Sequence, residues 1–296
     1  MIDRRLVAVL IVGALALPYA LLLAPPPHTT SGVVQIMSGA SIGETAAALH
    51  ERGAILSPFA FKVLASLFGG VQAGAYALEG EGALVLAYRM THGITGLSSE
   101  RVTIPEGTTI VEMEQLFGVD LPNDKEGYLF PDTYDFLPGT SAEQIVARMH
   151  ARYEEKIAPL RALIETSGHT EAEIIIMASI LEKEARQPET MRVVSGILWD
   201  RIKIGMALQV DAVFGYIKGV PTYHPSGEDL DIDSPYNTYK YRGLPPGPIG
   251  APGLNAIEAA INPTESPYLY YLTGTDGTMH YARTFEEHIA NRKYLR

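Results

Sequence analysis

The chain has 296 residues, and 47% of them are hydrophobic, so it can fill one large core or two modest ones, and disorder throughout is excluded. Its formal net charge is −11, from 34 acidic and 23 basic residues. A surface of that sign repels polyanions, so we expect no nucleic-acid partner. The chain contains no cysteine, which excludes disulfides, thiolate metal sites and thiol nucleophiles.

An uncharged apolar run extends from Leu6 to Ala24 near the N-terminus. Its 19 residues come close to the roughly 20 that a helix needs to cross a bilayer. Arg4 and Arg5 precede it, and basic flanks stay cytoplasmic, so the bulk of the chain is expected outside. Pro25–Pro27 then forms a stiff spacer. We therefore expect residues 1–32 to be a cytoplasmic tip, transmembrane anchor and Pro-rich stalk. A cleaved signal peptide is the alternative, and a buried core helix fits poorly.

A weak repeat follows, in which Val34–Glu44 recurs as Val102–Glu112. Each copy predicts a short strand, a glycine-containing turn and a helix that begins with a capping box. The predicted capping pairs are Ser41 with Glu44 and Thr109 with Glu112. The same β-turn-α unit is thus used twice.

Between the two copies, residues 58–68 predict a helix that carries the apolar residues Phe59, Val63 and Leu67. Gly69-Gly70 would end this helix. We assign residues 33–118 to a small α+β module and residues 119–296 to a second domain.

The second domain begins with a turn-rich stretch, LPNDKEGYLFPDTYDFLPG. A helix is expected from Ser141, although Gln144 at its third position makes its start weakly marked. A strong helix pattern covers residues 171–187, with Thr170 and Glu173 as its capping box and Pro188 just beyond.

The C-terminal part predicts a second helix over residues 189–204 and then long ordered loops from 208 to 267, rich in Pro, Gly, Tyr, Asn and Asp. The remaining predictions are a short helix at 255–261, a hairpin of 268–273 with 278–283, and a closing helix at 285–295. The fold class is therefore α+β: a transmembrane helix, a small module, and a mixed domain of helices, ordered loops and a small sheet.

Glu182 projects from an otherwise apolar helix stripe, formed by Ile175, Ala178 and Ala185. Apolar surroundings raise the pKa of a carboxyl group, as a general acid at neutral pH requires. The plainer interpretation is a salt bridge to Arg186. Glu184 points elsewhere and is expected to be solvated or structural.

Two further clusters could bind a ligand. The stretch EGYLFPDTYDF interleaves aromatic rings with carboxylates, which suits carbohydrate, although a packed turn is the more ordinary interpretation. The segment around Gln209 and Asp211, with SPYNTY and GLPPGPI, can line a cleft or serve as a rigid loop. No metal site, cofactor or nucleotide motif is predicted, since the histidines are scattered and HExxH, GxSxG, Walker A and GxGxxG are absent. His280 and His288 are secondary candidates.

Six motifs occur in a fixed order after the apolar run: EGYLFPDTY, MASILEKEA, LQVDAV, SPYNTY, GLPPGPI and SPYLYYL. This pattern resembles the endolytic murein transglycosylase family (YceG-like), from about Val33 to the C-terminus. The resemblance implies that the module at 33–118 is LysM-like and that 119–296 is the catalytic transglycosylase domain. It implies that Glu182 is the catalytic acid/base. The substrate-binding residues that it implies are Glu126, Tyr128, Asp132, Tyr134, Gln209, Asp211, Tyr236, Asn237, Thr238 and Tyr239.

The activity that this resemblance implies is non-hydrolytic cleavage of the MurNAc–GlcNAc bond of peptidoglycan, leaving 1,6-anhydro-MurNAc ends and terminating glycan elongation. One carboxylate and no cofactor suffice, because the substrate's own hydroxyl replaces water. The expected partners are glycan strands, the inner membrane through residues 6–24, and cell-wall synthases. The expected location is a single-pass inner-membrane protein facing the periplasm or cell exterior. The alternatives are a lysozyme-like muramidase, with Glu126 or Asp211 as second carboxylate, and a non-catalytic wall-binding scaffold.

Overall fold

The computed structural model describes residues 31–220 and 225–295, together with Ala14, Ala16, Tyr19, Leu22 and Ala24. The predicted anchor at 6–24 lies mostly outside these residues. Within the part of the chain that is described, no helix has the length and apolar character needed to cross a bilayer.

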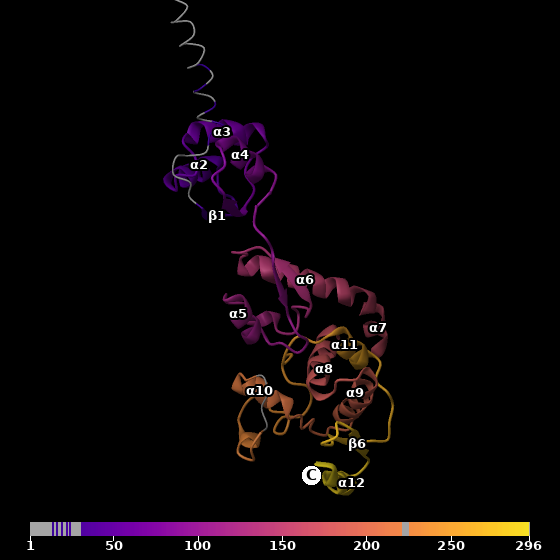
Figure 1. The fold of residues 1–296 in the computed structure, drawn as a ribbon. Coiled ribbons are helices and arrows are strands. Elements are labelled where there is room, and N and C mark those ends of the chain that lie inside the picture. The colour runs from indigo at the N-terminus through magenta and orange to yellow at the C-terminus, as the bar shows by residue number, and fades with distance from the viewer. Residues whose placement is uncertain are drawn as a thin grey trace, which may run out of the picture. The chain divides into compact units, whose positions relative to one another are not determined.

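The fold is mixed α+β, with helices and three separate two-stranded sheets (Figure 1). The chain divides into two compact units. Unit 1 comprises the described residues up to Arg101 together with Asp135–Thr140, and unit 2 comprises Val102–Tyr134 and Ser141 onward. Each unit has its own hydrophobic cluster.

Unit 1 is built from an antiparallel pair of strands and three helices. Strand β1 (Gly32–Ile36) pairs with β2 (Gly74–Leu78), and Val34 lies opposite Tyr76. The helices are α2 (Ile42–Glu51), α3 (Pro58–Leu67) and α4 (Ala83–Thr91). Their buried side chains meet those of the strands in one core that includes Leu49, Phe61 and Met90. The predicted first strand and the two predicted helices of this region are confirmed, whereas β2 and α4 carry weaker patterns and were not predicted.

Helix α3 turns its apolar stripe outward. Phe61 and Ala65 are buried, while Phe59 and Leu67 remain 77% and 75% exposed. Gly69 and Gly70, both with positive φ, follow the helix as predicted. The periodicity therefore located the helix correctly without showing which side would be buried.

The helix starts in both units follow the predicted capping chemistry. The side chain of Ser41 accepts from the backbone N of Glu44, Thr109 accepts from Glu112, and Thr170 accepts from Glu173. Ser141 and Gln144 also form a complete capping box at the start of α6 (Ala142–Ile157). The expectation of a weakly marked start there was wrong, because an amide oxygen returns the hydrogen bond as a carboxylate does.

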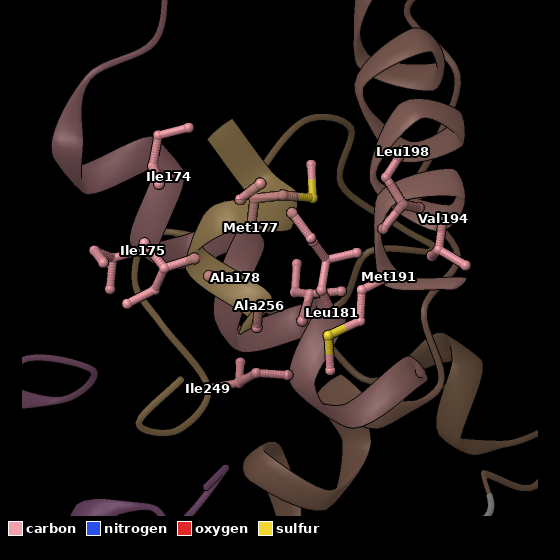
Figure 2. Packing of buried hydrophobic residues seen from close by; sticks show 14 of the residues in the cluster. Ile174, Ile175, Met177, Ala178, Leu181, Met191, Val194, Leu198, Ile249 and Ala256 are labelled. Carbon is pink, nitrogen blue, oxygen red and sulfur yellow. The ribbon is translucent and has the colours of Figure 1, made fainter. Parts of the chain in front are cut away.

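Unit 2 is organised around α8 (Glu171–Glu184), which packs against α9 (Pro188–Lys203) and α11 (Leu254–Ile261) (Figure 1). Figure 2 shows the core between them: Met177 and Leu181 of α8 face Met191 and Val194 of α9. The helices of this unit that precede α8 are α5 (Ile110–Phe117), α6 and α7 (Arg161–Ser167). Residues 174–181 are buried without a break, so α8 is the central helix of the unit.

The predicted loop region of unit 2 contains a helix that the sequence did not suggest, α10 (Ala212–Lys218). Asp211 at its start makes no side-chain cap and Gly215 lies inside it, so its local pattern is weak. The predicted hairpin is confirmed as β5 (Tyr270–Thr273) with β6 (Met279–Ala282), followed by α12 (Phe285–Asn291).

Unit 2 also contains short 3₁₀ helices, at Asn123–Lys125, Ala158–Leu160, Asp229–Asp231 and Arg292–Leu295.

Strands β3 (Glu100–Thr103) and β4 (Thr133–Phe136) pair with each other, and the boundary between the units runs through both. The second copy of the repeat, from Val102, therefore belongs to the same compact unit as α8. The backbone N of Gly107 donates to the carbonyl of Ala251, and the N of Ala251 donates to that of Thr108, which fixes this copy to the loop before α11.

Candidate active site

Helix α8 carries the two candidate carboxylates, Glu182 and Glu184, close to its C-terminal end. Residues two apart on an α-helix point to nearly opposite sides. The two side chains consequently meet different surroundings, although only Lys183 separates them in the sequence.

Glu182 lies against the start of α11. Its Oε2 accepts a hydrogen bond of 2.9 Å from the backbone N of Gly253, the N-cap residue of α11. Burial raises the pKa of its carboxyl group, as the apolar stripe predicted, and the charge of Glu106 raises the pKa further. Within the described residues no ion pair joins it to Arg186. This position fits a helix cap, since a carboxylate at a helix N-terminus is stabilised by the free N–H groups there.

Glu184 lines a pocket of about 450 Å³ on the other side of α8. Its Oε2 accepts a 3.0 Å hydrogen bond from the hydroxyl of Tyr271 on β5. Burial raises the pKa of Glu184 to about 7, and the charge of Asp211 adds to this, while Tyr271 and Arg201 act in the opposite direction. Glu184 was expected to be solvated or structural, and only the first of these was wrong, because the hairpin and the segment at 209–211 enclose it. A carboxyl group that is half protonated near neutral pH, in a pocket, can both donate and accept a proton.

Gln209, Asp211 and Tyr239 line the same pocket as Glu184. The hydroxyl of Tyr239 donates to Oδ1 of Asp211 at 2.6 Å. Gln209 has a φ of +50°, and it is the only residue other than glycine with a positive φ in the described part of the chain. A left-handed backbone at such a residue costs about 1–3 kcal/mol and is concentrated at functional sites. Three of the predicted substrate-binding residues are thus brought together.

The neighbouring residues of the YNTY motif are not among the lining residues of the pocket, and they make contacts within the fold. Asn237 is fully buried, and its amide donates to the carbonyls of Leu230 and Ile232. The hydroxyl of Thr238 accepts from the backbone N of Val210 at 2.9 Å, which fixes the strained segment at 209–211. Tyr236 packs against Tyr216, with ring centroids 4.9 Å apart.

The four predicted residues of the EGYLFPDTY motif do not line the pocket of Glu184. Tyr134 is buried and donates to the carbonyl of Phe130, Tyr128 packs on Tyr153, and Asp132 forms an ion pair with Arg152 at 2.7 Å. These contacts are those of a packed turn.

Glu126 differs from the other residues of its motif because its carboxyl group is buried and only partly satisfied. Oε2 accepts from the backbone N of Ile110 at 3.2 Å, whereas Oε1 has no hydrogen-bond partner among the described residues. Burial raises its pKa to about 7.

Several pocket residues were not predicted from the sequence. Arg201 is buried, donates to the carbonyls of Leu269 and Leu208, and places its guanidinium 5.3 Å from the ring centroid of Tyr270. Tyr271 belongs to the quoted SPYLYYL motif, but nothing in the pattern assigned it a role. His288, a secondary candidate, lies at the pocket wall, and its buried Nδ1 finds no hydrogen-bond partner in the part of the chain that the structure describes. Burial lowers the pKa of His288.

The described residues contain no group of three His, Cys, Asp or Glu side chains that could hold a metal ion. The polar groups that line the pocket of Glu184 include carboxyl, phenol, amide and guanidinium groups.

Comparison with known proteins gives matches over most of the chain. The sequence model of the YceG-like family matches residues 34–294. An endolytic murein transglycosylase of Bacillus subtilis (strain 168) is 29% identical over 304 residues, covering 88% of this chain and 84% of that protein. One from Streptococcus pneumoniae (serotype 2, strain D39) is 36% identical over 172 residues, which is 56% of this chain and only 31% of that protein. The crystal structure of a putative YceG-like protein from Listeria monocytogenes covers 89% of this chain at 29% identity, with a TM-score of 0.58.

Proposed function

Because the chain belongs to the YceG-like family, we propose that it is a lyase: a peptidoglycan lytic transglycosylase that cleaves glycan strands internally. The relatives named endolytic murein transglycosylase support this activity. The observation that carries it within the structure is a pocket that combines a carboxyl group of raised pKa with amide, phenol and carboxylate groups suited to sugar hydroxyls.

We propose Glu184 as the acid/base of the reaction, and we keep Glu182 as the alternative. Glu184 shares a pocket with Gln209, Asp211 and Tyr239, whereas Glu182 accepts from the N-cap of α11. A general acid must reach the substrate atom that it protonates, so geometry takes priority over the pKa of either group. The position of Glu184 in one pocket with these predicted sugar-binding residues supports this choice.

The proposed reaction needs one carboxyl group. The protonated acid gives its proton to the glycosidic oxygen as the bond from C1 of N-acetylmuramic acid to that oxygen breaks. The resulting carboxylate then accepts the proton of the 6-hydroxyl of the same sugar, whose oxygen forms the new bond to C1. No water is consumed, and the product carries a 1,6-anhydro ring. Because the nucleophile belongs to the substrate, proximity supplies much of the rate.

Substrate binding is proposed for the residues around this acid. Gln209, Asp211 and Tyr239 can hydrogen-bond sugar hydroxyls directly. Tyr236, Asn237 and Thr238 act on this proposal as positioning residues. Thr238 holds the 209–211 segment directly, while Asn237 holds the turn at 230–232 and Tyr236 packs on Tyr216. Glu126, Tyr128, Asp132 and Tyr134 remain predicted substrate-binding residues, and the packed-turn contacts of the last three favour an indirect role for them.

The test compares Glu184→Gln with Glu182→Gln on purified glycan strands. We expect the first variant to lose about 10²- to 10⁴-fold in cleavage rate, the size typical of a lost general acid, while remaining folded. Glu182→Gln is the matched control, because it makes the same change on the same helix. If Glu184→Gln cleaves glycan at the full rate and Glu182→Gln loses the activity, Glu182 is the acid/base.

A lysozyme-like muramidase is the second candidate, because Asp211 lies in the same pocket and could activate water. Mass spectrometry of the products separates the two reactions: anhydro ends support the transglycosylase, and free reducing ends support the hydrolase. A wild-type chain that binds glycan strands without cutting them would indicate a wall-binding scaffold.

The cellular setting belongs to the same proposal. Residues 6–24 are proposed as a single-pass inner-membrane anchor, with the rest of the chain on the outer side and a stalk up to residue 32. The module at 33–118 is proposed as LysM-like and residues 119–296 as the catalytic domain, with cell-wall synthases as partners and termination of glycan elongation as the role. Resistance of the chain to alkaline extraction from membranes tests the anchor.

A further inference from the structure

Unit 1 exposes an apolar surface on the outer side of α3, which we call the α3 face: Phe59, Val63 and Leu67, with Phe68 just beyond the helix. The first three follow one another at intervals of four residues, so they form one stripe along the helix. Phe59 and Leu67 are among the most exposed large apolar side chains in the described residues. A contiguous apolar stripe of this kind marks an interaction site.

The charge pattern around the α3 face is unlike that of the rest of the chain. Residues 53–78 contain one charged residue, Lys62, although the whole chain carries a net charge of −11. Lys62 is itself exposed on α3. A helix with an apolar stripe, a cation and no acidic residue of its own suits an anionic lipid surface, where the stripe enters the headgroup boundary and the cation meets phosphate.

The position of unit 1 in the sequence brings it close to a bilayer if residues 6–24 form the proposed anchor. Only seven residues, 25–31, separate the end of that run from β1. Seven residues reach at most roughly 25 Å when fully extended. A compact unit of about 100 residues has a radius of gyration near 13 Å, so one of its faces must lie at or near the headgroups.

We propose that the α3 face of unit 1 rests in the outer surface of the anchoring membrane. This inference depends on the membrane anchor of the proposed function, and it is independent of the cleavage chemistry. Membrane lipid is favoured over glycan as the occupant because Phe59, Val63 and Leu67 offer no hydrogen bonds, and the hydroxyls of a sugar held there would lose water without replacement.

The absence of native cysteine allows a direct test with single labels. The full-length chain is reconstituted in vesicles of phosphatidylethanolamine and phosphatidylglycerol, with a polarity-sensitive fluorophore on Phe59→Cys or Leu67→Cys. The control is Met37→Cys, at the residue after β1, because Met37 is apolar and 70% exposed but does not belong to the α3 face. We expect blue-shifted emission at 59 and 67, and a loss of at least half of that emission when nitroxide-labelled lipid is included. The label at 37 should show neither effect.

The charge at Lys62 gives a second readout. Lys62→Glu should reduce the quenching at position 59 in vesicles that contain phosphatidylglycerol, since it replaces attraction to anionic lipid by repulsion. Equal quenching at 37, 59 and 67 would overturn the proposal. So would an emission change at 59 that soluble glycan fragments or an added synthase cause and lipid does not.

Failure of this inference can be told apart from failure of the proposed function. A chain that resists alkaline extraction and cleaves glycan but shows no lipid quenching at 59 overturns the α3-face proposal alone. A chain that alkali extracts from the membrane lacks the anchor, which overturns both the anchor and the inference that depends on it. Loss of glycan cleavage with normal quenching contradicts only the enzymatic proposal.

Discussion

Glu182 and Glu184 show how far the surroundings of one carboxyl group can differ from those of another two residues away. Glu182 accepts a hydrogen bond from the backbone N–H of Gly253, the N-cap residue of α11. Glu184 faces a pocket with a phenol, a guanidinium and a second carboxylate. Burial raises the pKa of both carboxyl groups. A raised pKa alone therefore does not separate a helix cap from an acid, and the comparison of the two glutamine variants is designed to do so.

The pH dependence of cleavage should report Glu184. Its protonated form is the acid, so kcat/KM should fall as pH rises through about 7, the pKa to which burial raises this group. Tyr271→Phe removes the hydrogen bond that favours the carboxylate, so the pKa rises and the descending limb should move to higher pH.

Tyr153→Phe is the matched control for Tyr271→Phe. It also removes a tyrosine–glutamate hydrogen bond, to Glu171 at 2.8 Å, but Tyr153 does not line the pocket. Its pH profile should match that of the wild type. A descending limb that stays in place in Tyr271→Phe would mean that another group titrates.

Glu126 should make the protein less stable as pH rises. Its pKa is about 7 in the folded chain against 4.5 ordinarily, so the folded state holds the proton more tightly. The stability contributed by that proton is complete below 4.5 and is lost as pH rises through about 7. Relative to the wild type, Glu126→Gln should therefore gain about 2 kcal/mol in free energy of unfolding between pH 5 and pH 8, measured in urea.

Glu173→Gln is the control for that measurement. Hydrogen bonds from Thr170 lower the pKa of Glu173, so its titration lies below pH 5 and its contribution is already constant above it. The difference between this variant and the wild type should not change between pH 5 and pH 8. An equal change in both variants would contradict the assignment to Glu126.

At the scale of elements, the approach of α9 to the segment after α11 depends on Gly196. A Cβ atom added there would lie 2.2 Å from the carbonyl oxygen of Thr264, whose backbone N donates to Arg192 of the same helix. Both partners at this contact are backbone, so neither can move away cheaply. Gly196→Ala should lower the stability of unit 2 by about 1–3 kcal/mol, in spite of the better helix propensity of alanine.

Gly43→Ala in α2 makes the same substitution where there is room. The nearest atoms to an added Cβ are 3.7 Å away or more, so only the helix propensity changes. This variant should stabilise unit 1 by about 0.5 kcal/mol, which thermal unfolding can detect. The prediction is a difference of sign between the two variants, and destabilisation by both would contradict it.

At the scale of the whole molecule, the two hydrophobic clusters share no residue. A compact unit with its own core can unfold as a cooperative unit, so calorimetry should resolve two transitions. Phe61→Ala should lower the midpoint of one transition, and Leu198→Ala that of the other. Each deletes a fully buried side chain, at a cost of about 2–5 kcal/mol. One transition that both substitutions shift equally would show that the units unfold together.

Local sequence patterns correctly predicted most of the helices and the C-terminal hairpin. Ser41, Thr109 and Thr170 cap their helices as predicted, because capping depends on groups three residues apart. Strand β2 and helices α4 and α10 were not predicted, because packing stabilises them more than the intrinsic secondary-structure preference of their residues does. The ordered motifs by themselves pointed to the family to which the chain belongs.

The tertiary structure decided which side chains meet. It brought Glu184, Gln209, Asp211 and Tyr239 to one pocket with Tyr271, turned Glu182 toward α11, and left Phe59 and Leu67 outside. The sequence could establish that Glu182 and Glu184 point to opposite sides of α8. It could not establish that Glu184 lines a pocket, because the pocket walls come from the 209–211 segment and the C-terminal hairpin, and only long-range packing places those beside the helix.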